Sequence, residues 1–331
     1  MNVRQKLLFV LSVCFMGVLL YTIVFGKDRR LSKIPLLPSS AVVQVKDLHI
    51  KGVKEPFNCS LVEDVKGDYL LAFRFMEGKK NRLGIAELDK NFEEKCPYHL
   101  VDTWSDETED ARIIYDGDDY YLVYNDQLPC EKHFCRGMYL SKLNRDDFTI
   151  EYKTSFDLHL RPVEKNWVPF VAKNERSEKE IQLAYSLVPH KILSVTDPKS
   201  SDLTQLFFKN NPSYRRFFWD WGVVRGGTPA IMVDGEYLSF FHSSFGKKRR
   251  WYVMGAYTFE AKPPYRVTRV SKHPIFYKEI KNQRIVFPSG FVQDRIDGEE
   301  VFHISYGEMD CRSKLVTIKK KDIFDAMKSL D

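Results

Sequence analysis

The sequence predicts an all-β fold, a five-bladed β-propeller preceded by an N-terminal transmembrane helix. Three observations support this prediction. Five similar turn-and-strand units recur along the chain, helical periodicity is lacking between residue 41 and the last dozen residues, and one apolar run lies near the N-terminus. The chain has 331 residues, of which 44% are hydrophobic and 14% aromatic. This composition suffices for a sizeable core and excludes disordered and disulfide-scaffold classes.

The N-terminal region predicts a membrane anchor. Residues 1–6 form a short tail, and residues 7–25 form an uncharged, almost wholly apolar run. About 20 such residues span the hydrocarbon layer as a helix. The alternative is a cleaved signal peptide, whose apolar region usually has only about 7–15 residues and ends in small residues. We therefore expect a single-pass signal anchor with the following domain lumenal or extracytoplasmic, joined by a short stem at 26–40.

The positive charge of the chain belongs mainly to this N-terminal region. The formal net charge is +6, but six basic groups and one acidic group lie within the first 33 residues. The remainder therefore carries 45 basic and 44 acidic groups. We expect no nucleic-acid partner, because the body has no excess of positive charge.

The cysteines predict no metal centre. Cys130 and Cys135 can close a small disulfide loop in an oxidising compartment, with His133 between them. Zinc binding is the alternative for this loop, but no second ligand pair completes a four-ligand set. Phosphate-loop, dinucleotide, serine-hydrolase and zinc-protease motifs are also absent from the sequence.

Residues 41–331 are predicted to form the propeller. Each unit consists of a tight turn followed by an aromatic-rich alternating strand, and the turns lie at Gly67, Gly117, Ser177, Gly235 and Gly298. Asp-Gly turns provide the positive φ that hairpin tips require. A period of about 50–60 residues is typical of propeller blades. A large β-sandwich is the alternative, but it does not explain the period. The segment 322–330 predicts a short terminal helix.

Polar segments recur in phase with these hairpins. One segment precedes each hairpin strand, and the five span 57–60, 109–112, 161–167, 221–229 and 287–290. In a propeller the innermost strands converge on a central funnel. Their polar ends are therefore predicted to meet in one site.

The same segments resemble motifs of the family-130 glycoside hydrolases and phosphorylases, which act on β-mannosides, and of related β-1,2-mannosyltransferases. The resemblance runs in order from about residue 55 to residue 315. One of its elements is Glu109-Asp110-Ala111-Arg112, which is similar to the family's Glu-Asp-Pro-Arg, with Ala111 in place of the proline. The other matching segments are Arg161 to Asn166, Gly226 to Ile231, Phe241-His242-Ser243, Phe287 to Gly290 and Tyr306 to Asp310.

The resemblance implies residue roles. Asp110 is expected as the general acid, whose carboxyl must stay protonated near neutral pH so that it can protonate the leaving oxygen. The positions expected to bind phosphate are Arg74, Arg161, Lys165 and His242. The positions expected to bind sugar are Asn58, Arg112, Asn166, Trp167, Arg225, Tyr306 and Asp310. The structural alternatives are solvated strand edges for the arginines and core packing for His242 and the tryptophan.

These expectations together predict a membrane-anchored enzyme that makes or breaks β-mannosidic bonds with inversion. Inorganic phosphate or a sugar phosphate is the expected co-substrate, with no other cofactor, and an oligosaccharide or glycan is the substrate. A water-using glycosidase and a non-catalytic glycan-binding propeller are the alternatives.

Overall fold

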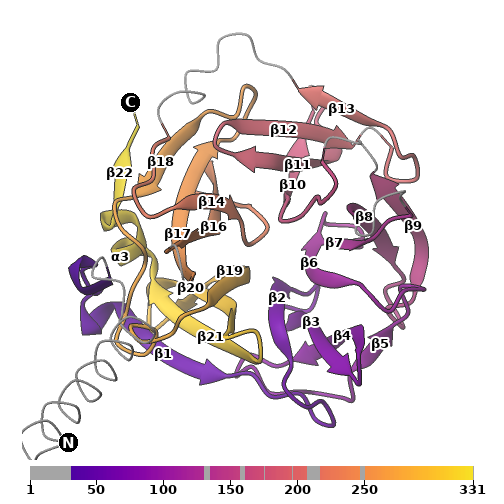
Figure 1. Cartoon of the computed structure of the whole chain (residues 1–331), viewed down its shortest axis with the longest axis horizontal. Coiled ribbons are helices and arrows are strands. Elements are labelled where there is room, and N and C mark those ends of the chain that lie inside the picture. The colour runs from indigo at the N-terminus through magenta and orange to yellow at the C-terminus, as the bar shows by residue number, and fades with distance from the viewer. Residues whose placement is uncertain are drawn as a thin grey trace, which may run out of the picture. The chain divides into compact units, whose positions relative to one another are not determined.

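Five antiparallel sheets form the blades of a propeller in the computed structural model (Figure 1). The structure describes residues 31–129, 135–156, 161–174, 176–195, 197–206, 217–246 and 250–330. The propeller lies in the unit that begins at Leu36, and residues up to Pro35 form a separate unit that includes the short helix η1 (Leu31–Lys33). The predicted fold class is therefore confirmed for the propeller.

The first three blades are each four consecutive strands. Blade one contains β2 (Phe57–Glu63), β3 (Tyr69–Glu77), β4 (Lys80–Leu88) and β5 (His99–Val101). Blade two contains β6 (Glu109–Tyr115), β7 (Tyr120–Gln127), β8 (Arg136–Leu143) and β9 (Ile150–Phe156). Blade three contains β10 (Val168–Lys173), β11 (Lys179–Leu187), β12 (His190–Val195) and β13 (Leu203–Leu206).

The last two blades also take strands from the ends of the propeller. Blade four contains β14 (Val223–Gly226), β15 (Ile231–Val233), β16 (Glu236–Phe245), β17 (Trp251–Glu260), β18 (Val267–Ser271) and the C-terminal β22 (Met327–Ser329). Blade five contains β19 (Val286–Ile296), β20 (Glu299–Glu308), β21 (Arg312–Lys319) and β1 (Val42–Asp47), which follows helix η2 (Ser39–Ala41). Pairing of β1 with β21 closes the ring between its first and last segments.

The predicted hairpin turns join the innermost strand of each blade to the second strand. Two of them, Asp234-Gly235 and Asp297-Gly298, have positive φ at both residues, with values of 49° and 84° and of 49° and 83°. This is the conformation that a two-residue hairpin turn with the right-handed twist requires. The predicted terminal helix is shorter than expected. Helix α3 (Lys320–Asp325) is followed by β22, which pairs with β18.

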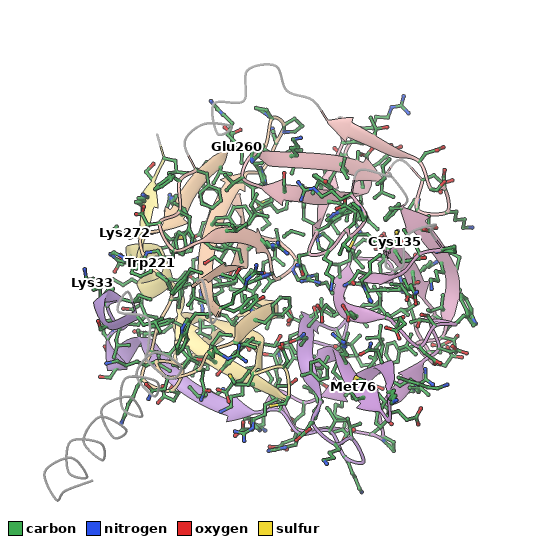
Figure 2. The ribbon with its side chains drawn as sticks, in the orientation of Figure 1. Lys33, Met76, Cys135, Trp221, Glu260 and Lys272 are labelled. Atoms are coloured by element: carbon green, nitrogen blue, oxygen red, sulfur yellow. The ribbon has the colours of Figure 1, made fainter. Side chains whose placement is uncertain are left out.

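Apolar side chains between neighbouring blades form the core (Figure 2). Leu70 of β3 packs in one cluster with Ile113 of β6, and this cluster joins blades one and two. Blades five and one approach closely at Gly290, where an added Cβ would lie 2.1 Å from the backbone nitrogen of Leu61. Only glycine permits this approach of β19 to β2.

The predicted anchor at 7–25 lies outside the described residues. Within the ranges given above, no helix is long and apolar enough to cross a membrane. Cys130 also lies outside the described residues, whereas Cys135 is disulfide-bonded. The other described cysteines, Cys59, Cys96 and Cys311, are free.

Candidate active site

The predicted polar residues meet where the innermost strands begin. Asn58 in β2, Asp110 in β6 and Asn166 just before β10 occupy equivalent places in successive blades, with positive φ of 52°, 54° and 62°. The left-handed conformation is uncommon outside glycine, but asparagine and aspartate tolerate it best. Register shifts in the β2–β3 and β6–β7 ladders lie at the first two of these residues. A bulge therefore frees each of these two side chains from the regular alternation of its strand.

The Asp110 carboxylate is held from two sides. Asn58 Nδ2 donates a hydrogen bond of 2.8 Å to its Oδ1, and Arg74 Nη1 lies 3.2 Å from the same oxygen. Burial alone would raise the pKa of Asp110. The nearby charges, chiefly those of Arg74 and Arg112, and the Asn58 hydrogen bond outweigh burial and lower this pKa below its ordinary value. Asp110 is therefore ionised at neutral pH, and the expectation of a protonated carboxyl in the ligand-free protein is wrong.

The Glu109 carboxylate forms ion pairs with three cationic side chains. Its carboxylate oxygens lie 3.1 Å from Arg74 Nη2, 3.0 Å from Lys165 Nζ and 3.4 Å from Arg136 Nη2. Two of the expected phosphate ligands, Arg74 and Lys165, are thus already paired with a carboxylate. Arg136, which was not predicted as a site residue, enters from β8 and also donates to Asn125 Oδ1 at 2.6 Å. No sequence motif marks Arg136, because its role depends on the neighbouring strand.

Arg112 is fully buried and links three blades. Its Nε donates to the backbone oxygen of Gly227 at 2.6 Å, and its Nη1 donates to the backbone oxygen of Asp110 at 2.6 Å. Its Nη2 donates to Asn166 Oδ1 at 3.2 Å. Burial lowers the pKa of Arg112 to about 10, so the guanidinium keeps its charge at neutral pH. Arg112 therefore holds the backbone at Asp110 and Gly227 in place, together with the side chain of Asn166.

His242 does not provide the expected positive charge. It lies on β16 with 2% of its surface exposed. Burial, followed by the charges of Arg112 and Arg225, lowers the pKa of His242 to about 3. The ring is therefore neutral, and its Nδ1 has no hydrogen-bond partner among the described residues. Arg225, which pairs opposite His242 in the β14–β16 ladder, is exposed.

Three expected site residues lie away from this network. Arg161 is exposed, with its guanidinium 5.7 Å from the Tyr185 ring centroid. No ion pair within the described ranges joins Arg161 to Glu109 or Asp110. Trp167 is 1% exposed, within the core between blades two and three, and Tyr306 is also buried. Both were expected to bind sugar, but in this structure neither ring offers a free face on which a sugar could stack.

Asp310 provides a second carboxyl near Asp110. It follows β20, has a φ of 55°, and the residue is exposed at the surface. The partial burial of its carboxyl and the negative charge of Asp110 raise the pKa of Asp310, while Arg74 and Arg284 partly offset this rise. The two carboxyls thus have pKa values displaced in opposite directions, an arrangement that suits paired acid and base chemistry.

A separate cavity of about 1240 Å³ lies farther along the same innermost strands. The innermost strands of all five blades contribute to its lining, among others through Leu61, Ile113, Phe170, Ile231 and Phe291. The cavity also reaches the turn residues Gly117 and Ser177. It is therefore the turn-side part of the central channel, whereas the Asp110 site lies where the innermost strands begin.

Comparisons with known proteins show the fold of the chain. No protein-family model matches it, and no match is found among the curated proteins. Among solved structures it is similar to a β-1,2-mannobiose phosphorylase from Listeria innocua in complex with β-1,2-mannobiose, at 18% identity and a TM-score of 0.56 over 85% of this chain and 94% of that one.

Two further solved structures share this fold. A mannose phosphorylase from Leishmania mexicana in complex with phosphate has 13% identity and a TM-score of 0.55 over 88% of this chain and 92% of that one. The third structure belongs to the GH130 family of mannoside phosphorylases, which contains glycoside hydrolases that target β-1,2-mannosidic linkages in Candida mannan. It has 14% identity and a TM-score of 0.59 over 87% of this chain and 97% of that one. At these identities the similarity establishes a shared propeller fold.

Proposed function

We propose that the chain is a carbohydrate-active enzyme that makes or breaks β-mannosidic bonds with inversion, using phosphate or a sugar phosphate. The observation that carries this proposal is the buried Asp110 carboxylate, bonded by Asn58 and Arg74 at the start of the innermost strands. The mannoside-active neighbours with the same fold support this substrate class. The motif resemblance from residue 55 to residue 315 supports the same class.

The ionised state of Asp110 favours the synthetic direction. A base is needed there, because the acceptor hydroxyl must lose its proton as its oxygen attacks the anomeric carbon. Asp110 accepts that proton, the new C–O bond forms, and the bond to the donor phosphate breaks, so that phosphate leaves with the electron pair. A single displacement inverts the anomeric configuration. In the reverse reaction, phosphate attacks and the protonated Asp110 returns its proton to the leaving oxygen.

The charge around Asp110 supports an anionic co-substrate. The described cationic side chains either form ion pairs in the network around Glu109 and Asp110 or shift the pKa values of Asp110, His242 or Asp310. They are Arg74, Arg112, Arg136, Lys165, Arg225 and Arg284. The described carboxyls among them are Glu107, Glu109, Asp110 and Asp310. Glu109 neutralises part of this charge, and the remaining excess of positive charge attracts a phosphate group. Neutral His242, with its free Nδ1, is suited to hydrogen bonding at the same place.

The test uses the full-length protein with mannose-1-phosphate or GDP-mannose and with mannose or mannobiose as acceptors. We expect release of phosphate or nucleotide together with a β-mannosidic product identified by NMR. Asp110→Asn should reduce the rate by about 10²- to 10⁴-fold, the usual contribution of a general acid or base. Asp297→Asn is the matched control, because Asp297 also has positive φ, at 49°, but lies at an exposed hairpin tip. Absence of turnover with both donors, and of phosphate-dependent cleavage of β-mannobiose, would overturn the proposal.

A water-using glycosidase is the second candidate, and Asp310 favours it. An inverting hydrolase needs two carboxyl groups, one acid and one base. The raised pKa of Asp310 suits the acid, and the lowered pKa of Asp110 suits the base that activates water. Cleavage of β-mannobiose at an equal rate with and without phosphate, with mannose as the product, would establish hydrolysis instead of phosphorolysis.

We also propose that residues 7–25 anchor the enzyme in a membrane with the propeller lumenal or extracytoplasmic. The apolar run and its charged flanks support this arrangement. The full-length protein should stay in the membrane pellet after alkaline extraction, and a chain lacking residues 1–25 should be released. Release of both forms would contradict the anchor.

A further inference from the structure

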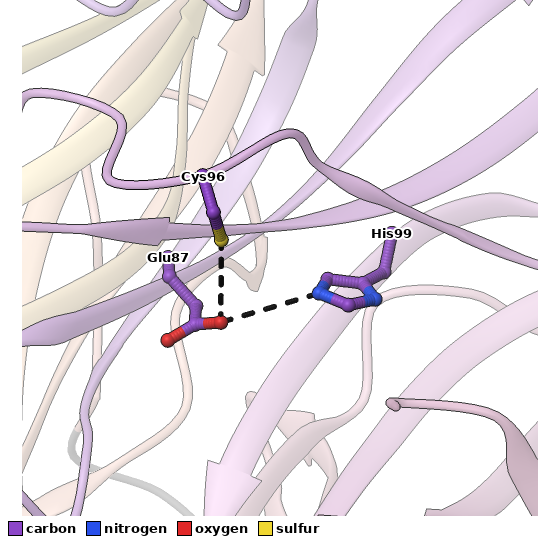
Figure 3. A group of neighbouring side chains, drawn as sticks. All are labelled: Glu87, Cys96 and His99. Carbon is purple, nitrogen blue, oxygen red and sulfur yellow. Dashed lines mark hydrogen bonds and ion pairs between the residues drawn. The ribbon is translucent and has the colours of Figure 1, made fainter. Parts of the chain in front are cut away.

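A cluster of metal-binding side chain types lies on the outer half of blade one. Glu87 lies on β4, His99 begins β5, and Cys96 belongs to the connection between these two strands (Figure 3). The candidate active site is at the start of the innermost strand β2, so this cluster does not belong to it. The cluster provides a carboxylate, a thiol and an imidazole, and the function proposed above uses none of them.

The three side chains converge on one small volume. Cys96 Sγ lies 3.4 Å from Glu87 Oε1, and His99 Nε2 lies 4.0 Å from the same oxygen. One potential ligand atom from each residue lies within 4.8 Å of the other two. In a tetrahedral zinc site, bond lengths of about 2.0–2.3 Å place neighbouring ligand atoms about 3.4–3.6 Å apart. One of these distances already has this value, and the others need only small side-chain adjustments.

The backbone holds all three positions. The backbone N–H of Lys95 donates to the backbone oxygen of Glu87 at 2.9 Å, which holds the connection beside Cys96 against β4. His99 pairs with Ile85 in the β4–β5 ladder, and Glu87 lies two residues farther along β4 on the same face. The His99 ring also packs against Phe148, with ring centroids 5.0 Å apart. The ligand atoms are therefore brought together by a sheet and its connecting loop, which limits how far they can separate.

We propose that Glu87, Cys96 and His99 bind a zinc ion, with water in the fourth position. Sulfur and imidazole ligands select zinc over magnesium or calcium, which prefer oxygen ligands. The side chains of Glu87 and His99 are 25% and 32% exposed, so solvent reaches the site and can supply the fourth ligand. A bound ion would clamp the connection between β4 and β5 onto the blade.

Binding replaces one proton by the metal. In the metal-free form the Cys96 thiol donates its hydrogen bond to Glu87. On binding, the thiol releases this proton to solvent, and the thiolate and the Glu87 carboxylate together balance the charge of the zinc ion. The other charged groups facing the cluster are Glu94 and Lys95, near Cys96, and Asp147, near His99. Lys95 is itself paired with Asp68, so it adds little repulsion.

The test measures metal binding by the full-length protein after chelator treatment. Titration with Zn²⁺ should show one binding site in the wild-type protein. Cys96→Ser and His99→Ala should each weaken zinc binding at this site at least about tenfold, because even changes to residues that only support the ligands cost about 10- to 100-fold. Titration with Co²⁺ should give the thiolate charge-transfer band and the intense visible bands of tetrahedral cobalt. Addition of Zn²⁺ should also raise the Tm of the wild-type protein but not that of Cys96→Ser.

Cys311→Ser is the matched control, because Cys311 is also a partly exposed free cysteine but lies outside the cluster. This variant should keep the zinc affinity, the cobalt spectrum and the Tm response of the wild type. Wild-type protein that shows no cobalt–thiolate band, or a Cys96→Ser variant that binds zinc as tightly as the wild type, would overturn the proposal. Neither result bears on mannosyl transfer, so this proposal and the proposed function fail independently.

Discussion

Replacing Gly307 with alanine tests whether the hydrogen bond from Asn58 controls Asp110. A Cβ at Gly307 would lie 2.0 Å from Asn58 Oδ1, whereas ordinary contact begins at 3.4 Å. The Asn58 Oδ1 atom must therefore move by about 1.4 Å, and we expect the amide to rotate so that Nδ2 loses its 2.8 Å hydrogen bond to the Asp110 carboxylate. The fold should survive, because the nearest atom is the end of a side chain that can rotate, and the backbone nitrogen of Asn58, at 3.2 Å, needs to give way by only a few tenths of an ångström.

The expected loss follows from the strength of this bond. A hydrogen bond to a charged group contributes about 1.5–3 kcal/mol. Because about 1.4 kcal/mol corresponds to a factor of ten in rate, kcat/KM for β-mannosyl transfer should fall about 10- to 150-fold. The Tm of Gly307→Ala should stay within a few degrees of the wild type.

A double-mutant cycle separates this mechanism from general disruption. Asn58→Gly removes the amide and accommodates the positive φ of 52° at that position. If the clash with Asn58 is the cause, Gly307→Ala should have no further effect on kcat/KM in the Asn58→Gly background. An equal loss in both backgrounds, or full activity of Gly307→Ala, would refute the reasoning.

Three further predictions concern charges buried in the propeller. Arg74→Gln should raise the pKa of Asp110, because the charge of Arg74 lowers this pKa. The pH below which the transfer rate falls should therefore shift upward. An unshifted pH dependence would count against Asp110 as the base. Arg112→Lys should lower the free energy of unfolding in urea by about 3–5 kcal/mol, because one ammonium cannot replace three diverging bonds; a loss below about 1 kcal/mol would contradict this. The pKa values of His190 and His242 lie near 4 and 3, below those in the unfolded chain. Their stability contribution is therefore complete above about pH 6.5 and is lost as pH falls toward these values, by up to about 1.4 kcal/mol per pH unit for each histidine. His190→Gln should make the free energy of unfolding depend less steeply on pH between pH 7 and pH 4. An unchanged dependence would be evidence against a lowered pKa of His190.

The propeller could be predicted because its signals are local. An Asp-Gly pair such as Asp297-Gly298 adopts its turn largely through its own backbone preferences, and five turns at a regular period define the blades. The closure of the ring was not predicted. The sequence of β1 does not indicate that this strand pairs with β21, because the pairing joins segments about 270 residues apart. Likewise, β22 extends blade four through contact with β18, which a helical pattern at 322–330 cannot show.

The membership of the site was easier to predict than its chemistry. The convergence of Asn58, Asp110 and Asn166 could be predicted, because their positions keep phase with the hairpins, whereas their roles in binding and catalysis stay predictions. The charge state of Asp110 depends on Arg74, which arrives from another strand. The neutrality of His242 depends on burial, which its neighbours in sequence do not determine. Both properties follow from packing across blades, and a motif does not encode that packing.

Arg112 connects the strain of the site to its function. Positive φ at non-glycine residues costs of order 1–3 kcal/mol each, and such a conformation persists only when the surroundings fix it. Arg112 fixes two of these residues, since it bonds the backbone oxygen of Asp110 and the side chain of Asn166. It also supplies part of the positive charge that keeps Asp110 ionised. One buried guanidinium therefore sets both the direction and the charge of the proposed base, so a substrate would meet a carboxylate that is already placed and deprotonated. Such preorganisation is the condition under which a fixed group stabilises a transition state without rearranging during the reaction.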